Sequence, residues 1–192
     1  MMQPFASLGF VKHARRSAFG ALLALAVFSH PGMALARHPE VVAELGEPRK
    51  LGDARYQVLA WSIFDAELWA TQPSFSWDQP FALSLTYQRD VRESSIVTRS
   101  VNGMADRVRI ASPERLTALL QTCFTDVRAG DRFTGVSLDE DRARFYLNGR
   151  QTCEMSWPGF RRAFFGIWLD GRGDDPAFSA RLTGGRPSSS NS

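Results

Sequence analysis

The sequence predicts an α+β domain in which one mostly antiparallel sheet carries its helices on a single face. Asn148-Gly149 stands between two extended runs and predicts a tight hairpin, because a type I′ turn needs positive φ at both central residues. Residues 81–88 alternate with the two-residue period of a strand, and residues 160–169 carry aromatic side chains at a helical period. With no internal repeat in the chain, these signals indicate one domain.

Further strands are predicted around these elements. In residues 81–88, Phe81, Leu83 and Leu85 share one face, as expected where helices cover one side of a sheet. Residues 52–70 fit either one long bulged strand or two closely joined strands. The other predicted strands are Arg132–Leu138, Arg142–Leu147 and Arg150–Met155, with a short strand at Val41–Leu45.

Helix signals lie between and after the strands. Ser112-Pro113-Glu114 is typical of a helix start, since it offers an N-cap hydroxyl, a first-turn proline and an acid near the positive end. Apolar residues at helical spacing predict a helix within residues 94–110, although Gly103 weakens it. The last predicted helices are 160–169 and 177–182, and the aromatic stripe of the former is more typical of a core than of a ligand cavity.

The first 36 residues have the pattern of a secretory signal peptide. Lys12, Arg15 and Arg16 precede an uncharged apolar run, and Ala34-Leu35-Ala36 ends it with small residues. The apolar run is shorter than the about 20 residues that span a bilayer; an uncleaved membrane anchor is the alternative. We expect an exported protein, periplasmic or secreted and without a membrane span after cleavage. A lead-in at 37–50, a domain at 51–183 and a disordered tail at 184–192 would follow the signal.

Cleavage would change the charge of the chain. The signal segment holds three of the 23 basic residues and no acid, so that 20 basic residues remain against 20 acidic ones. A net charge near zero gives no reason to expect a nucleic acid or an anionic membrane as partner.

The residue inventory excludes several kinds of catalytic site. His13 and His30 belong to the signal segment and His38 lies near the new N-terminus, so the domain lacks an internal histidine as base or ligand. Zinc-binding spacings, a nucleophile elbow and a phosphate-binding loop are absent from the sequence, and we expect neither metal nor cofactor. Cys123 and Cys153 leave two outcomes open, a disulfide or two buried thiols.

Six segments together resemble the exported bacterial branch of the chalcone isomerase-like proteins. The most specific are Arg144–Arg150, with the sequence Arg-Phe-Tyr-Leu-Asn-Gly-Arg, and Arg162–Asp170. The others are Gly52-x-x-Arg55, Phe64–Trp69, Phe81–Tyr87 and Asp131–Gly135. The similarity extends from about Leu51 to Leu182 and so covers the whole predicted domain.

This resemblance implies an open-faced β-sandwich, with a long antiparallel sheet, helices over one face and a ligand cleft between them. The family includes plant flavonoid-cyclising enzymes, non-catalytic relatives and fatty-acid-binding members. In the fatty-acid-binding members an Arg on the first long strand and a Tyr at its bend hold the ligand carboxylate. Arg55 matches the Arg, and Phe64 stands in place of the Tyr. Ile96 and Gly103 stand where the cyclising enzymes carry a Tyr and an Asn, which argues against cyclase activity.

The candidate ligand-binding residues are Arg55, Phe64, Tyr87 and Arg89. A guanidinium in an apolar cleft can bind a carboxylate through two parallel hydrogen bonds, and a neighbouring phenol and guanidinium can orient a polar head group. The alternatives are that Arg55 pairs with Asp53, Asp65 or Glu67 at the sheet edge, and that Tyr87 is a core residue beside a rim arginine.

We therefore predict an exported, non-catalytic protein that binds a lipophilic small molecule, such as a fatty acid, in the cleft. One alternative is an intramolecular lyase or isomerase that acts on a chalcone-like or other enone, with Arg55 stabilising a developing oxyanion. The second alternative is an interaction module without a small ligand, which would be favoured if aromatic side chains filled the cleft.

Overall fold

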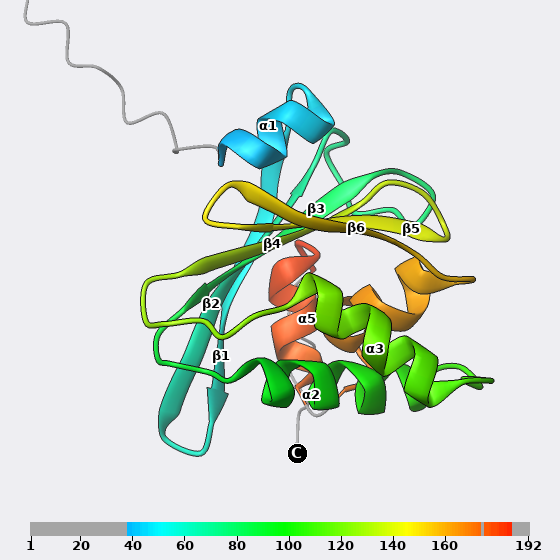
Figure 1. Ribbon diagram of the computed structural model, residues 1–192. Coiled ribbons are helices and arrows are strands. Elements are labelled where there is room, and N and C mark those ends of the chain that lie inside the picture. The colour runs from blue at the N-terminus through cyan, green and yellow to red at the C-terminus, as the bar shows by residue number, and fades with distance from the viewer. Residues whose placement is uncertain (1–37, 174, 186–192) are drawn as a thin grey trace, which may run out of the picture. The chain divides into compact units, whose positions relative to one another are not determined.

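The structure, a computed structural model, describes residues 38–173 and 175–185, which are organised by a six-stranded sheet (Figure 1). The strands are β1 (Arg49–Val58), β2 (Trp61–Ala70), β3 (Phe81–Tyr87), β4 (Arg132–Ser137), β5 (Arg142–Leu147) and β6 (Arg150–Ser156). Each strand pairs with the next one along the chain, and every pairing is antiparallel. Residues 52–70, for which the sequence allowed one strand or two, therefore form two.

The tightest turn of the sheet has the predicted chemistry. Asn148 and Gly149 join β5 to β6 with φ of 50° and 81°, which is the positive φ at both positions that the hairpin signal requires. The turn joins Leu147 to its partner Arg150, and the pairing of β5 with β6 then shifts register between Phe145 and Tyr146.

Helices cover the two faces of the sheet unequally. The helical segments on what we call the inner face are α2 (Glu93–Ala105), α3 (Pro113–Cys123), a π-helical turn (Arg161–Phe165), α4 (Gly166–Leu169) and α5 (Pro176–Leu182). In Figure 1, α2, α3 and α5 lie below the sheet and the short α1 lies above it, on the outer face. The prediction of an α+β fold with a long antiparallel sheet and its main helical layer on one face is confirmed.

The main hydrophobic core fills the layer between the inner face and these helices. Phe81, Phe145, Phe160 and Phe165 are almost completely buried there and meet largely edge to face, the arrangement that aromatic rings favour. The predicted aromatic stripe on residues 160–169 is thus in large part core.

The segment predicted as a short strand at Val41–Leu45 is instead a helix, α1 (Pro39–Leu45). Pro39 lies in its first turn, and Gly46 follows its end with a φ of 75°, both of which suit helix termini. These end signals prevail over the β-branched residues Val41 and Val42. A second, smaller hydrophobic cluster under α1 consists of Val41, Trp69, Ala82, Val136 and Tyr146. Part of the predicted lead-in therefore belongs to the fold.

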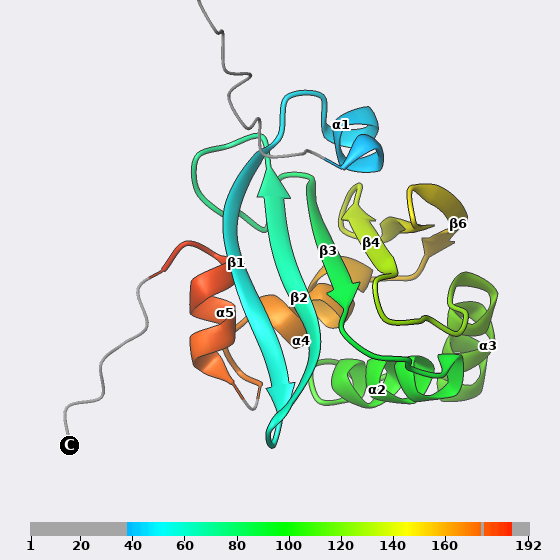
Figure 2. The same cartoon turned by 90° about the vertical axis from the view of Figure 1, so that its left-hand side faces the viewer.

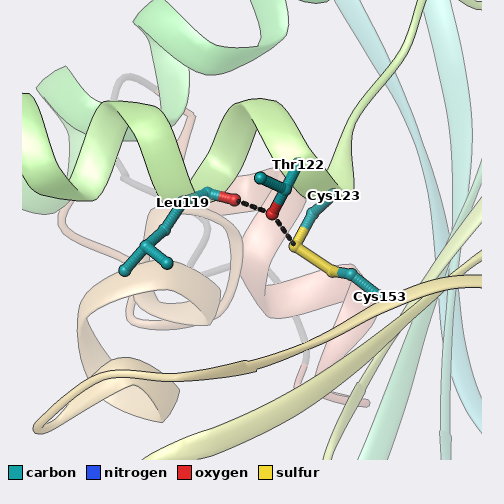
Figure 3. Close-up of a disulfide and its surroundings, with 4 residues drawn as sticks. All are labelled: Leu119, Thr122, Cys123 and Cys153. Atoms are coloured by element: carbon teal, nitrogen blue, oxygen red, sulfur yellow. Dashed lines mark hydrogen bonds between the residues drawn. A yellow bond between two sulfur atoms is a disulfide. The ribbon is translucent and has the colours of Figure 1, made fainter.

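Cys123 at the end of α3 and Cys153 in β6 form a disulfide, with Cα atoms 5.1 Å apart (Figure 3). Beside it, the hydroxyl of Thr122 donates a hydrogen bond of 2.7 Å to the carbonyl of Leu119, one turn back in the helix. Of the two outcomes that the sequence left open, the structure has the bridge, which ties the helical layer to the last strand.

The predicted signal peptide and residues 186–192 of the predicted tail lie outside the described residues. Within the described part, the helices are all too short or too polar to cross a membrane.

Candidate ligand-binding cavity

A cavity of about 460 Å³ lies between the inner face of the sheet and α2. Ligand pockets in proteins have volumes of about 300–1,000 Å³, so this cavity can hold a small organic molecule. Strands β1 to β4 form one wall, α2 forms the other, and the π-helical turn and α4 contribute a ring each. The aromatic residues that line it are Tyr56, Phe64, Tyr87, Phe124, Phe133, Phe164 and Trp168.

The aromatic rings of the cavity pack against one another and leave the space between the layers open. The Tyr56 ring stacks on Phe64 with centroids 5.0 Å apart, and Trp168 meets Phe64 edge-on at 5.3 Å. Tyr87 meets the other edge of Phe64 at 5.8 Å. The rings therefore form a wall, and the condition that would have favoured a ligand-free interaction module, a cleft filled by aromatic side chains, is not met.

Tyr87, one of the predicted site residues, is a buried phenol in this wall, with 5% of its surface exposed. Burial raises the pKa of its hydroxyl well above the ordinary value of 10.0, so the group remains neutral at physiological pH. Within the described part of the chain, that hydroxyl has no hydrogen-bond partner. A neutral hydroxyl of this kind can donate to an oxygen of a ligand.

Helix α2 supplies a cation that the sequence analysis missed. Arg92, Ile96 and Arg99 recur at helical spacing and all line the cavity. The Arg99 guanidinium donates a hydrogen bond of 2.9 Å to the hydroxyl of Tyr56 and lies 5.9 Å from the centre of the Trp168 ring. The spacing of these arginines was a usable signal, but the valine stripe of the same helix pointed to a different face.

The charged residues that line the cavity are three arginines and one aspartate: Arg89, Arg92, Arg99 and Asp90. The Asp90 carboxylate accepts a hydrogen bond of 3.0 Å from the backbone N–H of Ala129, so it is turned toward the loop after α3. The predicted site residue Arg89 is exposed and lies over the Trp61 ring, 5.4 Å from its centre. The cavity thus combines apolar walls with exposed arginine side chains.

Arg55 lies outside this cavity, on the outer face of the sheet, and the expectation that it points into the cleft is wrong. Its side chain is 57% exposed, and its Nε and a terminal nitrogen lie 2.6 and 2.9 Å from the two carboxylate oxygens of Asp65. A one-residue bulge at Ile63 in β2 places Arg55 opposite Asp65 and Tyr56 opposite Phe64. The ion pair at the sheet surface, the alternative considered for Arg55, is the observed arrangement.

A smaller cavity of about 230 Å³ adjoins the first one and shares Tyr56, Arg99 and Trp168 with it. In its wall, Arg107 donates hydrogen bonds of 2.9 and 3.1 Å to the carboxylate of Asp170, so these two largely buried charges satisfy each other. The described residues contain no group of three or more His, Cys, Asp or Glu side chains that could hold a metal ion.

Comparison with solved structures finds a similar arrangement of sheet and helices in another protein. The crystal structure of a fatty-acid-binding protein from Arabidopsis thaliana matches with a TM-score of 0.57 and 10% sequence identity, over 71% of this chain and 87% of that one. The fold is chalcone isomerase-like. At this identity the likeness concerns the chalcone isomerase-like fold alone. No family model and no curated protein matches the sequence.

Proposed function

We propose that this chain is an exported, non-catalytic protein that binds a long-chain carboxylic acid, such as a fatty acid, between the sheet and α2. The observation that carries the proposal is the cavity of about 460 Å³, with its aromatic wall and its three arginines. An apolar tail buried in it would gain about 0.8 kcal/mol per methylene group. The fatty-acid-binding protein with the same fold supports this ligand class. The disulfide supports an oxidising compartment.

Arg99 takes the place first expected of Arg55 in this proposal. Arg99 is exposed, and its guanidinium beside the aromatic rings can form charge-assisted hydrogen bonds with a carboxylate. Tyr87 donates a second hydrogen bond from its neutral hydroxyl, Phe64 contacts the tail, and Arg89 lies near the entrance. The carboxylate would thus lie between Arg99 of α2 and Tyr87 at the end of β3, and the tail along the aromatic wall.

Binding of palmitate and of methyl palmitate to the purified protein tests this assignment. We expect Arg99→Gln to weaken palmitate binding by roughly tenfold or more, because a hydrogen bond to a charged group contributes about 1.5–3 kcal/mol. The uncharged ester should bind the variant and the unchanged protein alike. Arg55→Gln is the matched control, since Arg55 is paired outside the cavity, and it should leave palmitate binding unchanged.

The same measurements separate the alternatives. Palmitate binding that falls in Arg55→Gln and persists in Arg99→Gln would contradict the assignment of the carboxylate site. Absence of binding by any fatty acid would contradict the proposed function itself. Sustained consumption of a chalcone, followed by loss of the enone absorbance, would support the intramolecular-lyase alternative instead.

A further inference from the structure

The turn between β1 and β2 exposes a run of apolar side chains beside the cavity. Leu59 is 94% exposed, Trp61 65% and Val58 47%, and among the described residues only one other large apolar side chain, Val42, is classed as exposed. The hairpin extends past α2 at the lower edge of Figures 1 and 2. Single exposed apolar residues are ordinary, but a contiguous group on a projecting turn marks an interaction surface.

The backbone of the turn gives a second, independent reason to regard these residues as functional. Leu59 has a φ of 55°, in the left-handed region that glycine and asparagine adopt most readily. A leucine at this position destabilises the turn and, being exposed, gains almost no packing in return. Its side chain therefore contributes little to folding.

The charged residues near the turn include two arginines. Arg89 lies over the Trp61 ring, and Arg92 lines the cavity, although Arg92 also shares a surface pocket with Asp90, Asp126 and Asp131. The nearest acid on β2, Asp65, is bound by Arg55 and by Gln88, whose side-chain nitrogen lies 2.9 Å from it. An exposed tryptophan and aliphatic group flanked by arginines matches the chemistry of the boundary between acyl chains and anionic headgroups.

We propose that the β1–β2 turn, residues 58–61, docks this protein on a bilayer that contains anionic phospholipid. Leu59 and Trp61 enter the interfacial region, and Arg89 and Arg92 contact the phosphates. Val58 belongs to both the turn and the cavity lining, so docking brings the cavity to the lipid surface. The near-zero net charge expected after cleavage argued against an anionic membrane, but a net charge does not describe how the charges are distributed.

Flotation of the full chain with vesicles of equal parts phosphatidylcholine and phosphatidylglycerol, without added fatty acid, tests the proposal. We expect the protein to float with these vesicles, with a blue shift of tryptophan fluorescence that is lost in Trp61→Phe. Leu59→Asn should lower the partition coefficient between vesicles and water by about tenfold, because it removes most of the apolar side chain that would enter the bilayer. The same variant should be at least as stable as the unchanged protein, since asparagine tolerates the positive φ.

Matched controls separate docking from general surface effects. Val42→Asn alters an exposed valine of α1, the helix on the outer face of the sheet, and should leave vesicle binding unchanged. Arg89→Gln with Arg92→Gln should weaken binding and its dependence on salt, whereas Arg150→Gln, at the β5–β6 turn, should not.

The proposal would be overturned by the absence of vesicle binding by the unchanged protein, or by binding that Leu59→Asn leaves intact. Self-association that is lost in Leu59→Asn, without vesicle binding, would assign the turn to contact between two copies and would equally overturn it. Because palmitate binding in free solution is measured separately, failure of membrane docking is distinguishable from failure of the proposed function.

Discussion

At the scale of single residues, the outer face of the sheet depends on a buried carboxylate. The Glu40 side chain has no exposed surface and accepts hydrogen bonds of 3.0 and 3.2 Å from Arg132 and of 2.8 Å from Thr134. Burial alone would raise the pKa of this carboxyl, but the hydrogen bonds and the charge of Arg132 together hold the pKa below its ordinary value of 4.5. The fold therefore stabilises the ionised form of Glu40.

Because folding lowers the pKa of the Glu40 carboxyl, the stability of the protein depends on pH. A carboxyl whose pKa is lowered by folding stabilises the protein fully above the unfolded-state pKa, and that contribution is lost as the pH falls through the lower folded-state pKa. Below pH 4.5, stability should therefore fall less steeply in Glu40→Gln than in the unchanged protein. Near neutral pH the variant should lose about 2 kcal/mol, less than the about 3–5 kcal/mol of a fully buried pair, because Arg132 is 23% exposed.

Urea unfolding followed by circular dichroism at several pH values measures both effects. Glu140→Gln, in the exposed turn after β4, is the control. It should change neither the stability near neutral pH nor the loss of stability below pH 4.5. If the free energy of unfolding fell equally steeply below pH 4.5 in Glu40→Gln and in the unchanged protein, another group would govern the loss of stability.

The contrast between Arg55 and Arg99 shows how far single site residues could be predicted. In a hairpin of regular register with a two-residue turn at 59–60, Arg55 would lie opposite Phe64 and share its face. The bulge at Ile63 moves Arg55 to the other face, and no turn residue announces it in the sequence. Phe64 and Tyr87 were predicted and do line the cavity, because β2 and β3 pair without further irregularity.

At the scale of the elements, predictions held where short-range chemistry decides the structure. The start of α3 at Pro113 and the β5–β6 turn are set by a few adjacent residues and were predicted, although the Ser112 hydroxyl makes no capping hydrogen bond. Helix α1 was missed because β-branched residues favour strands. What holds it in place, the buried contacts of Val41 and Glu40 with the outer face of the sheet, lies far away in the sequence.

Packing of α5 on β1 gives a prediction at this scale. A Cβ atom added at Gly52 would lie 2.0 Å from the carbonyl oxygen of Arg181 and 2.5 Å from that of Leu182, and backbone atoms cannot move aside cheaply. We expect Gly52→Ala to push α5 from the strand and to lower the free energy of unfolding by about 1–3 kcal/mol. Gly173→Ala is the control, since its Cβ would meet the nearest atom at an ordinary 3.4 Å.

Thermal unfolding of the two glycine variants gives the comparison directly. Equal stability of Gly52→Ala and Gly173→Ala would show that the end of α5 can shift without cost. In the expected case, the first segment of the family-like pattern, Gly52-x-x-Arg55, owes its glycine to backbone packing and has no part in ligand binding.

At the scale of the whole molecule, the domain leaves a cavity next to an otherwise close-packed aromatic core. This cavity of about 460 Å³ is partly open to solvent, so part of its apolar wall stays in contact with water while it is empty. A ligand that fills it binds the folded state only and should raise the melting temperature. The gain is about 2.7 kcal/mol at a free concentration one hundred times the dissociation constant.

A large side chain that fills the cavity should therefore prevent the ligand from binding and from raising the melting temperature. Ile96 faces the cavity from α2, and Ile96→Trp is expected to abolish palmitate binding and the palmitate-dependent rise in melting temperature while the domain stays folded. Thr98→Trp adds the same ring to the exposed side of the same helix, outside the cavity, and should leave both unchanged. Scanning calorimetry with and without palmitate measures the two variants alike. A palmitate-dependent rise that survives in Ile96→Trp and disappears in Thr98→Trp would place the lipid outside the space between the sheet and α2.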